Sequence, residues 1–303
     1  MKLSLSTCWN SWRHQDGRAM VEEILSLGFE SLELSHGIRS SQLEGVLQAR
    51  ERHKFSISSV HNFLPMPVEV LTDSPDCYEF TSHRSKDRDR ALRLTLSTIE
   101  WAEKLGAPFV VVHTGRIRSL NLTAPLRKMV EQGKIYSREF ISRKLDAVQA
   151  REKVAALHNA RVLELLHEAV SCAGKRGVKL GIENREYYEA VPSERDFPEF
   201  LQRLDPAHSG YWHDFGHAQI KHNMGLIDHA QHLERMAPRL IGCHIHDTRA
   251  PFRDHCPPFT GETPFDKLVP LLPQKCATIL EMSPRTEAAD ILKAAQEWNK
   301  KFK

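Results

Sequence analysis

Val110-Val111-Val112-His113 is a short apolar run that ends in a residue able to bind a metal ion. Runs of the same form recur along the chain, at Ser58–His61, Leu180–Glu183, Tyr211–Asp214, Ile241–His244 and Ile279–Glu281. Short segments rich in Val, Ile and Leu are typical of parallel strands that are buried on both faces. The carboxyl ends of such strands meet at one rim of a barrel. The repeated ending therefore predicts that His, Asp and Glu side chains gather at that rim.

Strand-like and helix-like segments alternate over the whole chain. The expected strands are Leu3–Cys8, Ser31–Leu34, Ser56–His61, Phe109–His113, Lys179–Glu183, Gly210–Asp214, Leu240–His246 and Thr278–Glu281. The expected helices are Arg18–Leu27, Ser41–His53 (with a capping box from Ser41 to Glu44), Arg88–Leu105, Val154–Ala173 (stopped by Gly174), Glu194–Leu204, Leu226–Met236, Phe265–Leu272 and Glu287–Phe302. This α/β alternation in 303 residues predicts a single (β/α)8 TIM-barrel domain over residues 1–303. An open doubly wound sheet fits less well, because no glycine-rich fingerprint follows the first strand.

Two connections are longer than a barrel requires. Residues 62–87 follow the third expected strand, and residues 114–153 follow the fourth as a basic and largely helical excursion. Both should leave the catalytic face of the barrel. We expect them to cover the mouth or to form a subunit interface over it, which leaves a homo-oligomer open.

The composition marks no nucleic-acid or membrane partner, since 27% of the residues are charged and the net charge is only +3. The first residues are too polar for a signal peptide, and no apolar run is long enough to cross a membrane. The six cysteines are scattered, which favours reduced thiols in a cytoplasmic protein. His222, His229 and His232 lie in a polar helical stretch and are expected at the surface.

Four of the strand-end residues would together form a metal site. They give three carboxylates and one imidazole: Glu183, Asp214, His244 and Glu281. Such an oxygen-rich set suits one divalent ion, Mn²⁺, Mg²⁺ or Co²⁺, and also allows Zn²⁺. Four further histidines could bind a second metal ion or contact a substrate: His61, His113, His217 and His255. One such residue alone is usually an ion-pair partner, but their joint occurrence indicates a metal centre.

The motifs around these residues resemble the xylose-isomerase-like TIM-barrel superfamily over nearly the whole chain. The matching stretches are Val112–Gly115, Ile182–Asn184, His213–His217, His244–Asp247 and Leu280–Glu281. The superfamily includes sugar isomerases, ketose 3-epimerases, inosose dehydratases and endonuclease IV-type apurinic endonucleases. The resemblance implies that the four strand-end ligands hold one metal ion. It also implies that Glu183 and Glu281 move protons and that His217 faces the substrate. Glu189 and Arg249 lie near positions at which the epimerases contact substrate.

The endonuclease resemblance is almost complete at the ligands. His61, His113, His217 and His255, together with the four ligands named above, match every zinc ligand of the nucleases but one. The missing ligand is an Asp two residues before His255, where this chain has Arg253; Asp254 is displaced by one position. A cation at that place opposes a third metal ion, and the modest net charge opposes DNA binding.

The sequence therefore predicts a metal-dependent isomerase or epimerase that acts on a sugar, keto-sugar or cyclitol through an enediolate. A lyase or dehydratase acting on a keto-sugar or inosose is the nearest alternative, and an apurinic endonuclease of DNA repair is a third. A non-enzymatic carbohydrate-binding protein ranks below these, because it would keep a full ligand set without chemistry.

Overall fold

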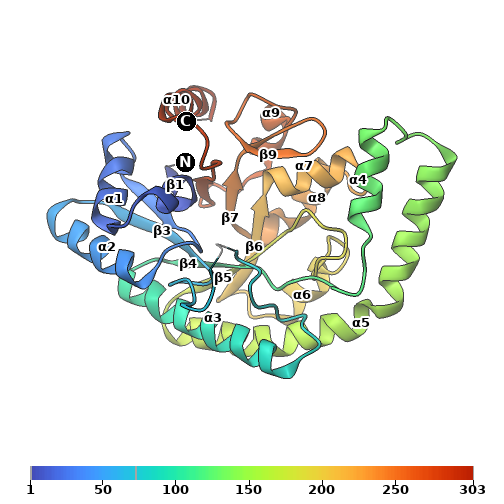
Figure 1. Cartoon of the computed structure of the whole chain (residues 1–303), viewed down its shortest axis with the longest axis horizontal. Coiled ribbons are helices and arrows are strands. Elements are labelled where there is room, and N and C mark those ends of the chain that lie inside the picture. The colour runs from blue at the N-terminus through green and yellow to red at the C-terminus, as the bar shows by residue number, and fades with distance from the viewer. Residues whose placement is uncertain (1, 72–73, 303) are drawn as a thin grey trace.

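The computed structural model of the protein describes residues 2–71 and 74–302. Eight parallel strands close into a barrel in the order β1-β10-β7-β6-β5-β4-β3-β2 (Figure 1). Their bounds are β1 Leu3–Ser6, β2 Ser31–Leu34, β3 Ser56–His61, β4 Phe109–Val112, β5 Lys179–Glu183, β6 Ser209–Asp214, β7 Leu240–Ile245 and β10 Ala277–Leu280. The predicted (β/α)8 barrel is confirmed, and the helices surround it as expected of that fold.

The helices between the strands are α1 Gly17–Ser26, α2 Ser40–Arg52, α3 Ser85–Leu105, α4 Thr123–Glu131, α5 Arg138–Lys175, α6 Phe197–Arg203, α7 Phe215–Asn223, α8 His229–Met236, α9 Phe265–Leu268 and α10 Ala288–Phe302. Helix α3 ends as predicted at Gly106, whose positive φ of 64° suits a residue without Cβ. The predicted capping box of α2 is wrong. The helix begins one residue earlier than expected, and the backbone N–H of Arg39 donates to Gln42 Oε1.

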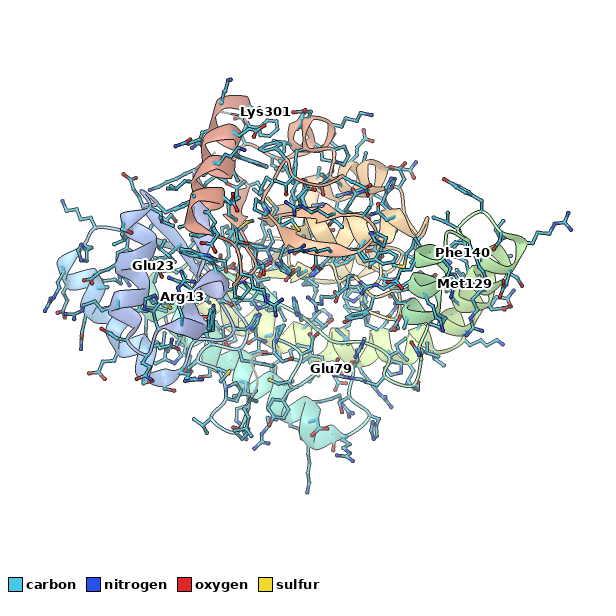
Figure 2. All side chains as sticks on the ribbon, turned by 45° about the horizontal axis from the view of Figure 1, so that its top comes forward. Arg13, Glu23, Glu79, Met129, Phe140 and Lys301 are labelled. Atoms are coloured by element: carbon cyan, nitrogen blue, oxygen red, sulfur yellow. The ribbon has the colours of Figure 1, made fainter. Side chains whose placement is uncertain are left out.

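The predicted excursion at residues 114–153 continues directly into the helix predicted before β5, and the long helix α5 spans the boundary between them. Helix α5 runs without a break for 38 residues, so the predicted start at Val154 and the predicted stop at Gly174 are both wrong. Helix α4 and the first part of α5 project from the side of the barrel and pack on each other through a small separate core that includes Leu126 and Phe140, whereas the rest of α5 packs against the barrel. Figure 2 shows Met129 and Phe140 together in this projecting pair.

A second structure absent from the prediction lies between β7 and β10. The strands β8 Asp247–Arg249 and β9 Arg253–Cys256 pair as an antiparallel hairpin outside the barrel. The hairpin carries His255 back toward the end of β10, where His255 Nδ1 lies 3.3 Å from the backbone oxygen of Glu281.

No helix in the described residues is long and apolar enough to cross a membrane.

The inside of the barrel is filled one layer below the expected ligands. Because side chains alternate along a strand, the residue two before each strand-end ligand also points inward. Val111, Trp212 and Ile279 occupy such positions and form one buried cluster. Gly181 and Gly242 face the same indole, since a Cβ on Gly242 would lie only 2.1 Å from Trp212. The large ring thus supports the floor of the ligand layer, and the two glycines make room for it.

The expectation that His229 and His232 lie at the surface is wrong. Both are buried, together with His213, and we call these three residues the inner histidine cluster. The phenol oxygen of Tyr211 is 2.9 Å from His213 Nδ1 and 2.9 Å from His232 Nε2, and His213 Nε2 is 3.0 Å from His229 Nε2. The composition of this segment suggested a polar, exposed helix. The histidines are buried because β6 packs against α8, and local composition does not reveal such a tertiary contact.

Candidate metal centre

The four expected ligands come from four neighbouring strands. Glu183 and Asp214 are the last residues of β5 and β6, His244 lies near the end of β7, and Glu281 follows β10 directly. The strand register pairs Asp214 with His244 and places Ile279 opposite His244. All four side chains are buried, and their ligand atoms lie within 4.8 Å of one another. The structure therefore brings together the whole set that the sequence proposed.

His244 lies among the carboxylates. Its Nδ1 is 3.3 Å from Glu183 Oε1, 3.2 Å from Glu281 Oε2 and 3.8 Å from Asp214 Oδ2. Burial lowers the pKa of His244, but Glu281, Glu33 and Glu183 together raise it well above its ordinary value. A proton on Nδ1 and a metal ion bound to Nδ1 exclude each other, so binding an ion would release that proton. A set of three carboxylates and one imidazole, converging on one buried position, fits a divalent cation.

Glu33 orients His244 from the other side, and the sequence analysis missed it. His244 Nε2 lies 3.1 Å from Glu33 Oε2, which also accepts a hydrogen bond of 2.7 Å from Ser59 Oγ. A carboxylate that accepts the second ring N–H of a ligand histidine fixes its tautomer and raises its basicity. The available signal was a charged residue inside the apolar strand segment Leu32-Glu33-Leu34.

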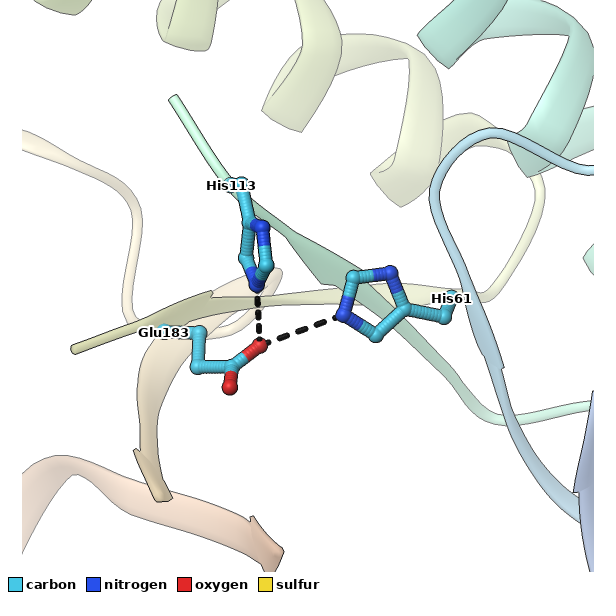
Figure 3. Close-up of side chains that lie close together, drawn as sticks. All are labelled: His61, His113 and Glu183. Atoms are coloured by element: carbon cyan, nitrogen blue, oxygen red, sulfur yellow. Dashed lines mark hydrogen bonds and ion pairs between the residues drawn. The ribbon is translucent and has the colours of Figure 1, made fainter. Parts of the chain in front are cut away.

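Two further histidines face the second oxygen of Glu183. His61 Nε2 is 3.2 Å and His113 Nε2 is 2.8 Å from Glu183 Oε2, and both rings point at this atom (Figure 3). Their other ring nitrogens are 3.0 Å from the backbone oxygen of Asn62 and 3.1 Å from Asp76 Oδ1, respectively. Glu183 thus presents Oε1 to the four-ligand site and Oε2 to the pair His61 and His113. We call His61, His113 and Glu183 Oε2 the second ligand group.

The remaining expected histidines lie on the side of β6 and β7. His217 is in the first turn of α7, where its backbone N–H donates a hydrogen bond of 2.7 Å to Asp214 Oδ1. It forms a further potential ligand group with Asp254 and His255. Asp254 therefore reaches this group although the sequence placed it out of register, while Arg253 is exposed. His246, which was not predicted, stacks on His255 with ring centroids 4.2 Å apart and lies 3.0 Å from Asp214 Oδ2 through Nε2.

These groups surround one cavity of about 220 Å³. Its walls include the predicted residues His61, His113, Glu183, His217, His255 and Glu281. Asp214 and His244 do not line the cavity and are fully buried, next to the lining residues Glu183 and Glu281. A larger hollow of about 450 Å³ lies beside the connection after β3, but none of the predicted site residues line it. The two hollows share the segment around Asp76, since Pro75 lines the small one and Asp76 the large one.

Glu189 and Arg249 lie away from this cavity. Glu189 is buried and accepts hydrogen bonds from the backbone N–H and the hydroxyl of Thr123, so it anchors the start of α4. Arg249 is exposed in β8, and its Nε donates to the backbone oxygen of Thr260 at 3.1 Å. Contacts of Glu189 and Arg249 with a substrate stay predictions. Such contacts would require the segments that carry these two residues to approach the cavity.

Arg185 and Glu186 are cavity residues that sequence reasoning missed, although they directly follow the motif Ile182–Asn184. Arg185 Nη1 is 3.0 Å from His113 Nε2, and its Nη2 is 3.2 Å from Asp76 Oδ2. Burial raises the pKa of Glu186, but Arg185 and His217 offset this and hold it low, at about 2. Asp76 belongs to the connection after β3, so that connection reaches the cavity wall; residues 72–73 of the same connection lie outside the described residues.

The chain belongs to the xylose isomerase-like TIM barrel family, whose model matches residues 21–302. Its fold is similar to that of a D-tagatose 3-epimerase-like protein, with 18% identity, a TM-score of 0.68 and coverage of 99% of this chain and 96% of that one. A 3-keto-D-glucoside 4-epimerase from E. coli matches with 16% identity, a TM-score of 0.70 and 99% coverage of both chains. An IolI protein with a bound zinc atom matches with 14% identity, a TM-score of 0.66 and coverage of 99% and 96%. No curated protein matches the chain by sequence.

Proposed function

We propose that the protein is a divalent-metal-dependent isomerase or epimerase of a small sugar, keto-sugar or cyclitol. The observation that carries the proposal is the convergence of Glu183, Asp214, His244 and Glu281 on one buried position beside a cavity that the two glutamates line. Sites for drug-sized ligands usually measure about 300–1,000 Å³, so the smaller cavity favours a compact polyol. The fold relatives named as sugar epimerases support the same class of substrate.

The carboxylates would have two tasks. Glu183, Asp214, His244 and Glu281 would hold the ion, and a divalent ion there would polarise a substrate carbonyl and favour its enediolate. Glu183 and Glu281 both line the cavity, so each has access to a substrate proton as well as to the ion. Proton transfer requires a base within roughly 2.6–3.2 Å of the proton's carrier. In the proposed reaction one glutamate removes the carbon-bound proton next to the carbonyl and the other returns a proton to the opposite face.

The test is solvent-deuterium exchange into substrate, measured with a panel of ketohexoses, 3-keto-glycosides and inososes. Glu281→Gln keeps an oxygen for the metal ion but removes the base, so exchange should fall by about 10²–10⁴-fold while part of the metal remains bound. Glu287→Gln, at an exposed position on the same connection, is the matched control and should exchange normally. Normal exchange in metal-loaded Glu281→Gln would eliminate the two-glutamate mechanism.

The product distinguishes the reaction types. An unchanged mass with altered stereochemistry or carbonyl position indicates the epimerase or isomerase. Loss of water from the same substrate indicates the lyase alternative, in which the enediolate eliminates a neighbouring hydroxyl.

The nuclease alternative is favoured by one observation, the grouping of His217, Asp254 and His255 into a further potential ligand set. It predicts incision of a duplex that contains an abasic site, with binding that weakens steeply as salt rises. Incision at nanomolar enzyme, abolished by His217→Ala, would replace the sugar proposal. Intact duplex under conditions that support sugar exchange would exclude the nuclease.

A further inference from the structure

The second ligand group brings three potential metal-binding atoms to one place, the Nε2 atoms of His61 and His113 and the Oε2 atom of Glu183. The Nδ1 atoms of His61 and His113 face oxygen atoms of Asn62 and Asp76, so each Nδ1 carries the ring proton. Both Nε2 atoms point at Glu183 Oε2. A carboxylate oxygen gathered with two imidazoles in a buried site is stabilised by positive charge close to it. A cation of the protein itself lies beside this group.

That cation is the guanidinium of Arg185. Its Nη1–H points at His113 Nε2 over 3.0 Å, the same atom that faces Glu183. The side chain is only 13% exposed, and Asp76 Oδ2 holds its Nη2 at 3.2 Å while Glu186 Oε2 lies at 3.5 Å. A guanidinium is always charged at physiological pH and has planar donors that fit two carboxylates at once. Arg185 is thus held by residues from two connections, those after β3 and after β5.

A metal ion and this guanidinium cannot share His113. An ion bound by the second ligand group would need His113 Nε2, which Arg185 Nη1 already approaches to 3.0 Å. It would also place two further positive charges beside a fixed one in a buried site, where screening is weak. The four-ligand site is different, because it uses the opposite oxygen of Glu183, whereas the hydrogen bonds and ion pairs of Arg185 go to Asp76, Glu186 and His113.

We propose that Arg185 takes the place of a second metal ion in the group of His61, His113 and Glu183, so that the centre holds one ion instead of two. This inference rests on the proposed metal centre and concerns its stoichiometry. Arg185 is then a specificity-determining residue for the metal site. It leaves Asp214, His244 and Glu281, with Glu183 Oε1, as the binding site for the single ion.

The experiment is titration of chelator-treated, full-length protein with Co²⁺, followed by visible absorption of the bound ion and by elemental analysis. Wild-type protein should bind one equivalent. Arg185→Met, which keeps a long side chain without the charge, should bind two, and the double variant Arg185→Met/His61→Ala should return to one. Arg185→Lys keeps the charge and should remain at one. His61→Ala alone should also remain at one, a measurement that needs no change at Arg185.

The outcomes separate the two proposals. Two equivalents in wild type, with one lost in His61→Ala, would overturn the inference, because the second group would then hold an ion beside Arg185. One equivalent in folded Arg185→Met would overturn it as well. Neither result touches the proposed function. Absence of any bound Co²⁺ in wild type would instead remove the metal centre and the inference with it.

Discussion

The metal centre and the inner histidine cluster are both buried and rich in histidine, but they differ in the partners of the imidazoles. In the metal centre, His244 lies within 3.3 Å of three carboxylates, those of Glu33, Glu183 and Glu281. In the inner histidine cluster, the side chains of His213, His229 and His232 form hydrogen bonds with the Tyr211 phenol, with the Gln219 amide and with one another.

The partners decide the direction of the net pKa shift of each buried imidazole. Burial lowers the pKa of His229 to about 3, and neighbouring imidazoles add to the decrease. Burial also lowers the pKa of His232 to about 4, because Lys221 and Arg235 act in the same direction and the opposing charge of Glu194 does not reverse it. Burial acts the same way on His244, but the carboxylates reverse the outcome and raise its pKa. Neutral imidazoles that donate to neighbouring groups are structural, whereas an imidazole facing carboxylates occupies a position suited to a cation. Burial alone therefore does not identify a metal-binding histidine.

The largest expected effect comes from removing the central imidazole of the metal centre. His244→Ala should weaken metal binding by on the order of 1,000-fold, since four ligands share a binding free energy of about 10–16 kcal/mol in tight zinc sites. His229→Gln in the inner histidine cluster is the contrasting variant and should bind metal as wild type does. Elemental analysis and competition with a chelating dye measure both. Equal metal content in the two variants would remove the distinction between the regions.

The inner histidine cluster should make the fold sensitive to mild acid. His229 and His232 titrate near pH 6.5 when unfolded but at about 3 and about 4 in the folded protein. At a pH between the folded and the unfolded pKa of each histidine, the unfolded state binds more protons than the folded state. The free energy of unfolding therefore decreases as the pH falls below 6.5. Each histidine contributes a slope approaching about 1.4 kcal/mol per pH unit.

Urea unfolding at pH 7.5, 6.0 and 5.0 measures this dependence. His229→Gln and His232→Gln should each flatten it relative to wild type, and the difference between variant and wild type cancels the carboxylates that titrate elsewhere. Parallel pH profiles for wild type and both variants would show that these rings are not held neutral by the fold.

The smallest expected effect tests how Glu33 acts on the metal centre through His244. Glu33→Gln keeps an oxygen that can accept the Nε2–H but loses the charge, so metal affinity should fall by about 10–100-fold. Glu30→Gln, at the exposed end of the connection before β2, is the matched control and should change nothing. The readout is the chelator competition used for His244. Equal affinity in the two variants would leave Glu33 a packing residue, not a positioning residue.

Most of the fold was predictable because it depends on local periodicity. Apolar strand segments such as Lys179–Glu183 and Ser56–His61 have the bounds that the sequence indicated. Helix ends were less accurate where tertiary contacts decide them. Helix α5 continues through Gly174, which packs directly against the His208 ring and has no room for a Cβ. The additional helix α7 begins directly after Asp214, whose side chain caps it by accepting a hydrogen bond from the backbone N–H of His217.

By itself the sequence determined the barrel and the four candidate ligands at its strand ends, because the two-residue repeat of a strand fixes which side chains point into the barrel. Only the tertiary structure decided the partners of those four residues. Glu33 and His244 are 211 residues apart, and Arg185 meets Asp76 across 109 residues. Such contacts depend on how the strands close and how the connections fold back over them, and no local pattern encodes them. The same reason explains the inner histidine cluster, where a helix that reads as polar is buried against β6.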